Sequence, residues 1–245
     1  MIRTTLLPAS PPVPLSVWLV DGRRAGGRAL RLAPGLLDGG QLERLAALRH
    51  AADRWTYAAG HVALRRLLGA RLGLAPQAVR FTRRPCAGCG GPHGRPEVAG
   101  GGDVRFSLSH SGDFALIAIA TEPVGVDIER VPAAETADSV SEVLHPYEAA
   151  ELAALPAELR PAAVTRAWTR KEAYLKGTGA GLSRSTTLDY LGTGPTPGAH
   201  PQDWTVRDVS VPDGYAAAVA VAVAVAAVED RSRTARGGVH LASAR

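Results

Sequence analysis

The spacing of apolar residues changes from helical to alternating near Val104, and this change constrains the fold more than any other feature of the sequence. Apolar residues in segment 36–74 recur mostly at helical intervals, whereas segments 114–120 and 124–131 have the pattern of strands. Residues 121–123 separate these two runs and have the length of a tight turn, which predicts a β-hairpin. The chain should therefore fold as a mixture of helices and strands.

The same reasoning places further elements along the chain. Residues 15–20 are predicted to form a short strand, and two helices should begin at Pro146 and Pro161, because proline is favoured in the first turn of a helix. The second helix is predicted to run through Lys176 and to stop at the glycines that follow it. Residues 215–228 alternate Ala and Val, which favours a buried strand over a helix.

Length and composition limit the classes of protein to consider. With 245 residues and 46% hydrophobic content, the chain can bury the core of one large domain or of two halves. No run reaches the roughly 20 apolar residues of a membrane-spanning helix, and the proline-broken segment 6–14 lacks the apolar core of a signal peptide. We therefore expect a cytoplasmic protein with disordered tails at residues 1–14 and 230–245.

The charge of the chain indicates an anionic partner. Its formal net charge is +5, and most of the positive charge comes from arginines spread along the sequence. The arginine doublets, such as 65–66 and 83–84, have no interleaved aromatic residues, which is weak support for a groove that follows a nucleic-acid backbone. We therefore expect neither nucleic acid nor membrane among the partners.

The two cysteines form a CxxC pair, Cys86 and Cys89, with His93 as a further possible metal ligand. A structural zinc site needs four ligands, and no second pair with matching spacing follows. This favours a loop whose thiols are inert or bind metal only loosely.

Lysine is almost absent from the chain, since only Lys171 and Lys176 occur among 28 basic residues. Arginine cannot replace lysine where a compact point charge, or an ammonium that can lose its proton, is required. The two lysines therefore point to chemistry in this segment. The alternative is that Lys176 survives by chance in a solvated i,i+4 pair with Glu172, which would contribute about 0.2–0.5 kcal/mol.

Two carboxylates stand side by side on the predicted strand 124–131. Alternation places Asp127 and Glu129 on one face, with Val126 and Ile128 on the other. Carboxylates held that close repel one another unless a cation lies between them, and Mg²⁺ favours such oxygen ligands together with water and phosphate oxygens. The alternative is the polar outer face of an edge strand.

The helix that contains the two lysines offers a third carboxylate. Trp168, Glu172 and Lys176 follow one another at intervals of four residues, so they share one stripe of the helix. A third metal ligand would then lie beside an ammonium that could neutralise or protonate a phosphate. The alternative for the bulky Trp168 is a place in the core.

Three motifs, in this order and spacing, resemble those of the Sfp-type 4'-phosphopantetheinyl transferases. They are FSLSHSGD at 106–113, GVDIE at 125–129 and WTRKEAYLKGTGAGL at 168–182. Two shorter matches, Gly94-Arg95-Pro96 and Asp53-Arg54, support the resemblance, which covers about residues 15–228.

The resemblance implies an α+β fold, a pseudo-twofold pair of similar α/β halves with the active site in the cleft between them. The halves would comprise residues 15–121 and 122–229. It also implies a Mg²⁺-dependent, monomeric enzyme of the holo-[acyl-carrier-protein] synthase type. Such an enzyme transfers 4'-phosphopantetheine from coenzyme A to a serine of an apo carrier protein and releases adenosine 3',5'-bisphosphate. The carriers of this family are typically acidic and belong to fatty acid, polyketide or nonribosomal peptide synthases, the last two typical of secondary metabolite biosynthesis.

The resemblance also assigns roles to single residues on the acidic side of the site. Asp127, Glu129 and Glu172 would hold Mg²⁺ on the coenzyme A pyrophosphate, and Lys176 would contact the same phosphates. Glu172 would activate the acceptor serine, either directly or through a water molecule.

Further residues would contact the coenzyme A nucleotide. Ser109 and His110 match family positions at the nucleotide phosphates, while Arg54 and Arg95 resemble cationic contacts to the phosphates and the adenosine end. Arg44 falls near one position of the basic pair that the family carries before its first long helix.

Two other functions use part of this set. A metal-dependent phosphodiesterase or nuclease would use the carboxylates and Lys176 on a different phosphate, whereas a non-catalytic module that binds coenzyme A or a nucleotide would keep the cations alone. The three carboxylates disfavour the binding module, and the full order of motifs disfavours the nuclease.

Overall fold

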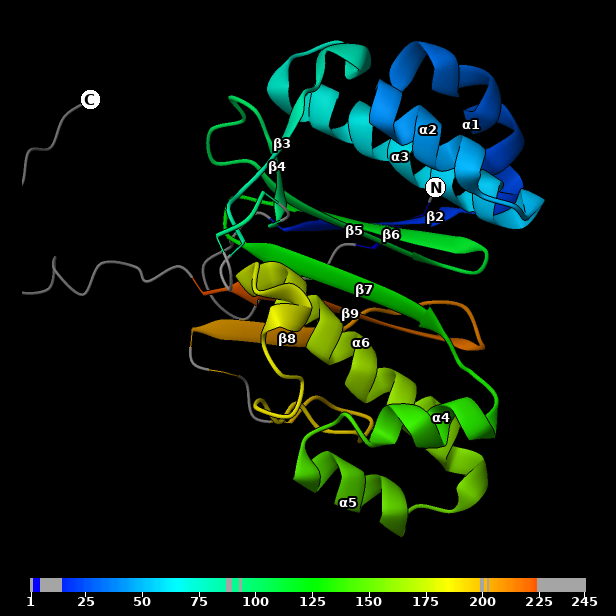
Figure 1. Cartoon of the computed structure of the whole chain (residues 1–245), viewed down its shortest axis with the longest axis vertical. Helices are drawn as coiled ribbons and strands as arrows, with labels where there is room; N and C mark the ends of the chain where they lie inside the picture. The colour runs from blue at the N-terminus through cyan, green and yellow to red at the C-terminus, as the bar shows by residue number, and fades with distance from the viewer. Residues whose placement is uncertain are drawn as a thin grey trace, which may run out of the picture.

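The fold was analysed in a computed structural model of the chain, and Figure 1 shows it from end to end. It contains both helices and strands, with more residues in helices, so the predicted α+β class is confirmed. The pseudo-twofold relation of the two halves stays a prediction. The residues that the structure describes are 2–4, 15–86, 90–92, 94–198, 201 and 203–223.

The N-terminal half builds a four-stranded antiparallel sheet in the order β1-β2-β6-β5. Strands β5 and β6 form a hairpin whose two-residue turn contains Gly112 at φ 52°, a conformation that glycine adopts without strain. A separate short hairpin, β3–β4, precedes it. The elements of this half are β1 (Ile2–Thr4), β2 (Ser16–Asp21), α1 (Gly22–Leu36), α2 (Gly39–Ala47), α3 (Ala51–Leu72), β3 (Phe81–Arg83), β4 (Pro96–Val98), β5 (Arg105–Ser111) and β6 (Phe114–Ala120).

The C-terminal half builds a three-stranded antiparallel sheet in the order β7-β9-β8. Its long helix α6 has Pro161 in its first turn and ends at Gly179, whose φ of 78° lies in the left-handed region. The elements of this half are β7 (Val124–Arg130), α4 (Ala134–Ser141), α5 (Pro146–Ala154), α6 (Arg160–Thr178), β8 (Trp204–Asp208) and β9 (Tyr215–Ala222).

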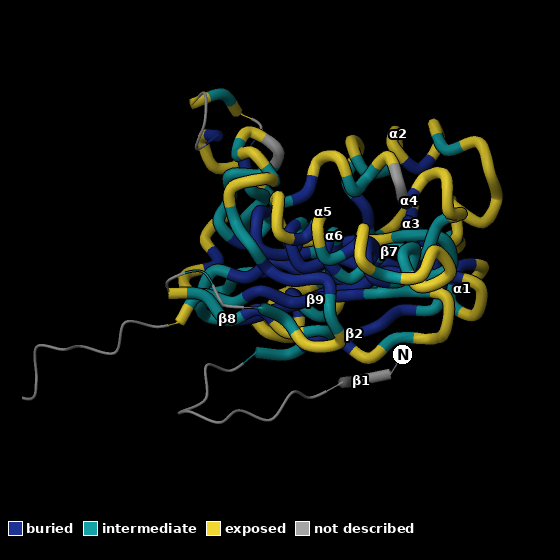
Figure 2. The backbone as a smooth tube through the Cα atoms, turned by 90° about the horizontal axis from the view of Figure 1, so that it is seen from below, coloured by how far each residue is buried: buried dark blue, intermediate teal, exposed yellow. Residues whose placement is uncertain are grey.

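The elements stack as four layers, helix–sheet–sheet–helix (Figure 1). Helices α1, α2 and α3 lie on the outer side of the first sheet, and α6 with α4 and α5 lies on the outer side of the second. The inner faces of the two sheets pack on each other through apolar side chains, among them Leu116, Val126 and Ile128. In Figure 2 the buried residues, in dark blue, are concentrated in these central strands. The apolar contact between the sheets therefore fixes how the two halves meet.

The predicted hairpin between segments 114–120 and 124–131 is wrong. Strand β6 pairs with β2 on one side and β5 on the other, so no free edge remains for β7. Strand β7 pairs instead with β9, about ninety residues later in the chain, for example Asp127 opposite Ala218. The three residues 121–123 thus connect two sheets rather than two paired strands.

Other predicted elements can be compared directly. The strand at 15–20 is confirmed as β2, and the helices that begin near Pro146 and Pro161 are confirmed as α5 and α6. The predicted strand 215–228 is confirmed as far as Ala222. Helix α1 was not predicted, because its four glycines and Pro34 hide the helical spacing.

Two further predictions concern the terminal tails and membrane-spanning helices. Residues 2–4 of the predicted N-terminal tail form β1, which pairs with β2, while the other residues of both tails lie outside the described part of the chain. Among the helices that the structure describes, none combines the length and apolar content needed to cross a bilayer.

Candidate active site

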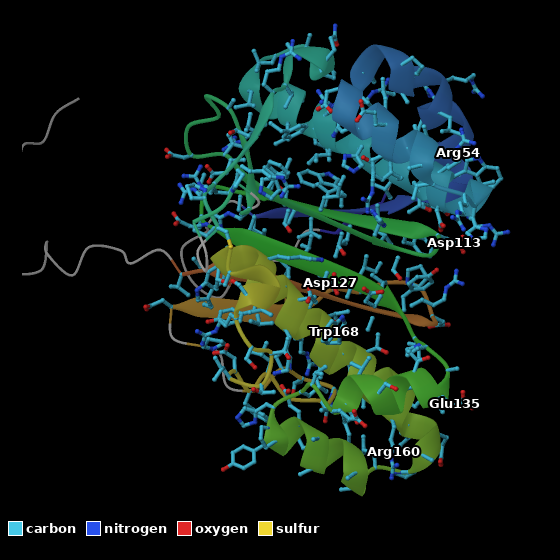
Figure 3. The ribbon with its side chains drawn as sticks, in the orientation of Figure 1. Arg54, Asp113, Asp127, Glu135, Arg160 and Trp168 are labelled. Carbon is cyan, nitrogen blue, oxygen red and sulfur yellow. The ribbon has the colours of Figure 1, made fainter. Side chains whose placement is uncertain are left out.

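Asp127 lies at the centre of the site, on the face of β7 that turns toward α6. The predicted alternation is confirmed, since Val126 and Ile128 point into the core between the sheets. Asp127 is only 1% exposed, which excludes a solvated outer face. Its Oδ1 accepts hydrogen bonds from the Lys176 ammonium at 2.6 Å and from the Ser109 hydroxyl at 2.7 Å. Figure 3 shows Asp127 near the middle of the molecule, where the two halves meet.

Two glycines allow α6 to approach β7 this closely. A Cβ on Gly125 would collide with the carbonyl oxygen of Ala173 and the amide of Gly177, and one on Gly177 would collide with the Trp204 ring. Backbone therefore packs on backbone at this crossing. The close approach brings Lys176, one residue before Gly177, within hydrogen-bond distance of Asp127.

All three predicted acidic residues have raised pKa values. Burial raises the pKa of Asp127, although the Lys176 ammonium opposes the rise. Burial, followed by the charge of Asp127, raises the pKa of Glu129. Burial also raises the pKa of Glu172, with Lys176 opposing and Asp127 adding to the rise. The carboxylates thus lie close enough to repel one another.

The donor chemistry of these residues fits a hard divalent cation. Asp127 Oδ2 is buried and accepts no hydrogen bond from the residues that the structure describes, so it is available to a ligand. Carboxylate oxygens are the ligands that Mg²⁺ prefers. Within the described part of the chain, however, no three Asp, Glu, His or Cys side chains converge as a metal site. Asp127, Glu129 and Glu172 would have to draw together by side-chain rotation, and the metal assignment stays a prediction.

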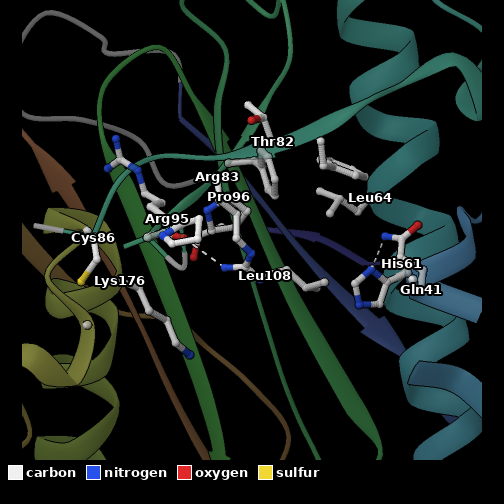
Figure 4. Close-up of a pocket in the computed structure, with 18 of the residues that line it drawn as sticks. Gln41, His61, Leu64, Thr82, Arg83, Cys86, Arg95, Pro96, Leu108 and Lys176 are labelled. Carbon is white, nitrogen blue, oxygen red and sulfur yellow. Dashed lines mark hydrogen bonds between the residues drawn. The ribbon is translucent and has the colours of Figure 1, made fainter. Parts of the chain in front are cut away.

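A cavity of about 1320 Å³ lies beside the acidic residues and draws its walls from both halves. Lys176 lines it from α6, while Arg44 from α2, Arg95 from the loop before β4 and His110 from β5 line it from the N-terminal half. Four of the predicted contacts to coenzyme A therefore share one cavity. Figure 4 shows Lys176 and Arg95 on one side, with Gln41 and His61 on the opposite side.

Arg95 and His110 are held by the protein around them. Arg95 donates a hydrogen bond to the carbonyl oxygen of Gly177 and lies 3.7 Å from Glu97, so it ties the β3–β4 region to the end of α6. His110 keeps an exposed ring surface, but desolvation and then the charge of Lys176 lower its pKa. It therefore carries a neutral ring at neutral pH until an anion binds beside it.

His61 is a cavity residue that the sequence reasoning missed. Gln41 Oε1 accepts from the buried Arg65 at 2.7 Å, which leaves the amide nitrogen of Gln41 to contact His61 Nδ1 at 2.9 Å. His61 Nδ1 is then the acceptor and Nε2 carries the proton. Burial, then His110 and Arg65, lowers the pKa of His61 to about 4. No spacing in the sequence signals this residue, because its contact with Gln41 depends on how α2 packs against α3.

Comparison with known proteins identifies the family. The sequence profile of the 4'-phosphopantetheinyl transferase superfamily matches residues 123–220. The 4'-phosphopantetheinyl transferase HetI of Nostoc sp. is 31% identical over 236 residues, which cover 90% of this chain and 94% of that protein. The chain belongs to the 4'-phosphopantetheinyl transferase superfamily.

Other members of the superfamily match shorter parts of the chain. A putative 4'-phosphopantetheinyl transferase of Synechocystis sp. is 32% identical over 174 residues, or 68% of this chain and 65% of that protein. The 4'-phosphopantetheinyl transferase AcpT of Salmonella typhimurium is 35% identical over 101 residues, or 40% of this chain and 53% of that protein. The resemblance drawn from the three motifs is confirmed.

The two lysines of this superfamily member have different surroundings. Lys176 contacts Asp127 and Ser109 rather than standing as a solvated pair with Glu172. Lys171 is 2% exposed and its ammonium lies 2.7 Å from Glu148, which is itself fully buried. Lys171 also donates to the carbonyl oxygen of Asp189. It is therefore part of a structural ion pair, away from the stripe that faces the site.

The remaining predicted residues divide between the cavity and other places. Trp168 is half-buried and packs against the α4–α5 cluster, so it belongs to the core. Arg54 lies exposed on the first turn of α3 and does not line the cavity (Figure 3). Cys86 is buried and lines the cavity, whereas Cys89 and His93 lie outside the described residues.

Proposed function

We propose that this chain transfers the 4'-phosphopantetheine group of coenzyme A to a serine of an apo carrier protein. The single observation that carries the proposal is that Lys176 joins two environments: it lines the cavity with Arg44, Arg95 and His110, and it contacts the buried Asp127. Coenzyme A carries a pyrophosphate and a 3'-phosphate, so a cavity lined by cations suits it. Belonging to the superfamily supports the same reaction.

The cations would bind and orient the leaving group. When serine attacks the phosphate bonded to pantetheine, the bond to the other phosphate of the pyrophosphate breaks and negative charge develops on adenosine 3',5'-bisphosphate. Lys176 places a compact charge there, fixed by Asp127 Oδ1 and the Ser109 hydroxyl. His110 would gain affinity for a proton as the phosphates bind, because their charge offsets that of Lys176.

Glu172 is our candidate for the base that takes the proton of the acceptor serine. Burial raises its pKa, which makes it a better proton acceptor at neutral pH than an ordinary glutamate. It lies on the same stripe of α6 as Lys176, one turn away, so base and cation would act on the same phosphate. Whether Glu172 accepts the proton directly or through water is open in this proposal.

Asp127, Glu129 and Glu172 would hold Mg²⁺, which supplies charge neutralisation at the phosphates when it is bound. The unpartnered Oδ2 of Asp127 supports this assignment. Holding the ion would also relieve the repulsion that raises the pKa of the three carboxyls.

We further propose that the enzyme is a cytoplasmic monomer of the holo-[acyl-carrier-protein] synthase type. Its acceptors would be carrier domains of fatty acid, polyketide or nonribosomal peptide synthases, and a role in secondary metabolism would follow from the last two.

One incubation tests the reaction against its alternatives. The protein is mixed with coenzyme A, Mg²⁺ and an apo carrier protein, and intact-mass spectrometry follows the carrier. A mass gain of one phosphopantetheine group, with release of adenosine 3',5'-bisphosphate, is expected. Cleavage of coenzyme A without modification of the carrier would indicate a phosphodiesterase, and binding of coenzyme A without cleavage would indicate a binding module.

A further inference from the structure

The two sheets meet along two edge strands, β5 of the first sheet and β7 of the second. Contacts between the two strands follow increasing residue number in both, from Ser107 with Val126 to Ser111 with Arg130. The strands therefore run parallel. Both strands are described at every residue, and no backbone ladder pairs them. Their polar backbone groups therefore need other partners along this boundary.

Serine side chains of β5 supply those partners. Ser107, Ser109 and Ser111 alternate along the strand and so point to the same side. The amide of Val126 donates to Ser107 Oγ and the amide of Arg130 donates to Ser111 Oγ, each at 3.1 Å. The three serines thus form a polar seam, which we call the serine seam, between the halves.

The same seam reaches the acidic residues of the site. The Ser109 hydroxyl donates to Asp127 Oδ1 at 2.7 Å and accepts from Lys176 Nζ at 3.1 Å. Burial raises the pKa of Glu129, and a hydrogen bond from Ser111 opposes that rise. Ser107, in contrast, accepts from a backbone amide. Ser109 therefore holds Asp127 across the boundary, and Ser111, fixed by the Arg130 amide, lies beside Glu129, the residue before Arg130.

We infer that Ser109 and Ser111 are positioning residues that orient Asp127 and Glu129 toward a shared cation across the boundary between the halves. Ser109 is 7% exposed, and its hydroxyl is engaged by Asp127 and Lys176. Its hydroxyl acts on the cation through Asp127. The inference rests on the proposed function, because the shared cation belongs to that proposal.

The test compares three alanine variants that each remove one hydroxyl from the same face of β5. Ser109→Ala removes the hydroxyl bonded to Asp127, and Ser111→Ala removes one that accepts from the Arg130 amide beside Glu129. Ser107→Ala is the matched control, because its hydroxyl is a partner of a backbone amide alone. Mn²⁺ serves as the probe, titrated into each protein alone and followed by electron paramagnetic resonance. Melting temperatures and kcat and KM with one apo carrier are measured alongside, and Ser111→Thr restores a hydroxyl.

We expect Ser109→Ala and Ser111→Ala to weaken Mn²⁺ affinity by roughly tenfold or more, the usual effect of losing a partner of a metal ligand. Ser107→Ala should keep wild-type Mn²⁺ affinity, and Ser111→Thr should recover most of it. Equal losses in all three alanine variants, or no loss in Ser109→Ala and Ser111→Ala, would overturn the inference, as would a wild type that transfers the group but binds no Mn²⁺. A wild type that binds Mn²⁺ but modifies no carrier would instead overturn the proposed function.

Discussion

The two halves of the molecule carry opposite charge. Residues 15–121 contain 15 arginines and seven acidic residues, whereas residues 122–223 contain eight basic and 14 acidic residues. The formal net charges are therefore +8 and −6. The modest charge of the whole chain, +5, hides this contrast because the halves largely cancel.

This difference explains why the candidate site lies at the boundary. A polyanionic substrate would be attracted to the basic half, which lines most of the cavity, while a divalent cation would be attracted to the acidic half, which holds Asp127, Glu129 and Glu172. Lys176 is the exception, because it is a cation that belongs to the acidic half and lines the cavity. The proposed reaction would thus draw one of its partners to each half.

Removing the central charge of the acidic half should have the largest effect. Asp127→Asn keeps the shape of the side chain but leaves Lys176 without its anion, so we expect kcat/KM to fall by roughly 10²–10³-fold. Asp113→Asn is the control from the basic half, because Asp113 forms only partly exposed ion pairs with Arg23 and Arg130. It should stay within a few-fold of wild type, and equal losses in both variants would contradict the central role of Asp127.

The two lysines should separate catalysis from stability. Lys176→Arg should lower kcat by about 10²-fold at an unchanged melting temperature, because the longer planar group displaces the phosphate. Lys171→Arg should instead lower stability by about 1–3 kcal/mol, because a larger group must fit beside buried Glu148. Denaturant unfolding and kinetics on both variants check this. Equal, near-wild-type values for both would mean that the lysines have no special role.

His61 should make the stability of the basic half depend on pH. Its pKa is about 4 in the folded protein, lowered by burial and by neighbouring His110 and Arg65. Below pH 6.5 the unfolded chain takes up a proton that the folded protein does not, so stability should fall by about 3 kcal/mol between pH 6.5 and 4 and level off below pH 4. Above pH 6.5 His61 is mostly neutral in both the folded and the unfolded chain, so it no longer makes stability depend on pH.

Urea unfolding at several pH values measures this dependence. His61→Gln should flatten the fall, whereas His50→Gln, which changes an exposed histidine of the same half, should leave it unchanged. An identical fall in both variants would assign it to other groups.

Surface charge should have the smallest effect. Arg28 and Arg31 are exposed on α1, which contains no acidic residue, so replacing both with Glu weakens the field that attracts an acidic carrier. We expect kcat/KM for the carrier to fall by up to about tenfold at low salt and to recover at high salt. The matched change on the acidic half, Glu135 and Glu142 to Arg, should not lower it. Salt-independent loss would contradict steering.

Local periodicity in the sequence predicted which side chains share a face at the candidate site. Alternation placed Asp127 opposite Val126, and the helical repeat placed Lys176 on the side of α6 that turned out to face β7. The order of the strands could not be predicted in this way. Whether β7 pairs with β6 or with β9 depends on which edge is free, and a single run of alternating residues does not contain that information.

For the same reason, the sequence does not reveal side-chain partners that lie far apart along the chain. The Glu148 that neutralises Lys171 lies in another helix, and the Gln41 that fixes His61 lies in α2. Each pair depends on how helices pack, so no spacing in the sequence reveals it. Gly125 and Gly177 were part of recognised motifs. Only the structure shows why glycine is needed there, because two backbones pack closely at these positions.

The position of β9 at the centre of the second sheet has a consequence for how the chain folds. The first sheet has all its strands once residue 120 is made, whereas β7 and β8 share no ladder until β9, residues 215–222, lies between them. Pairings such as Glu129 with Ala216 close a loop of almost ninety residues, which is slow to form. During synthesis the basic half can therefore fold before the acidic half has all the strands of its sheet. A chain cut before residue 215 should keep a folded first half and have no functional site.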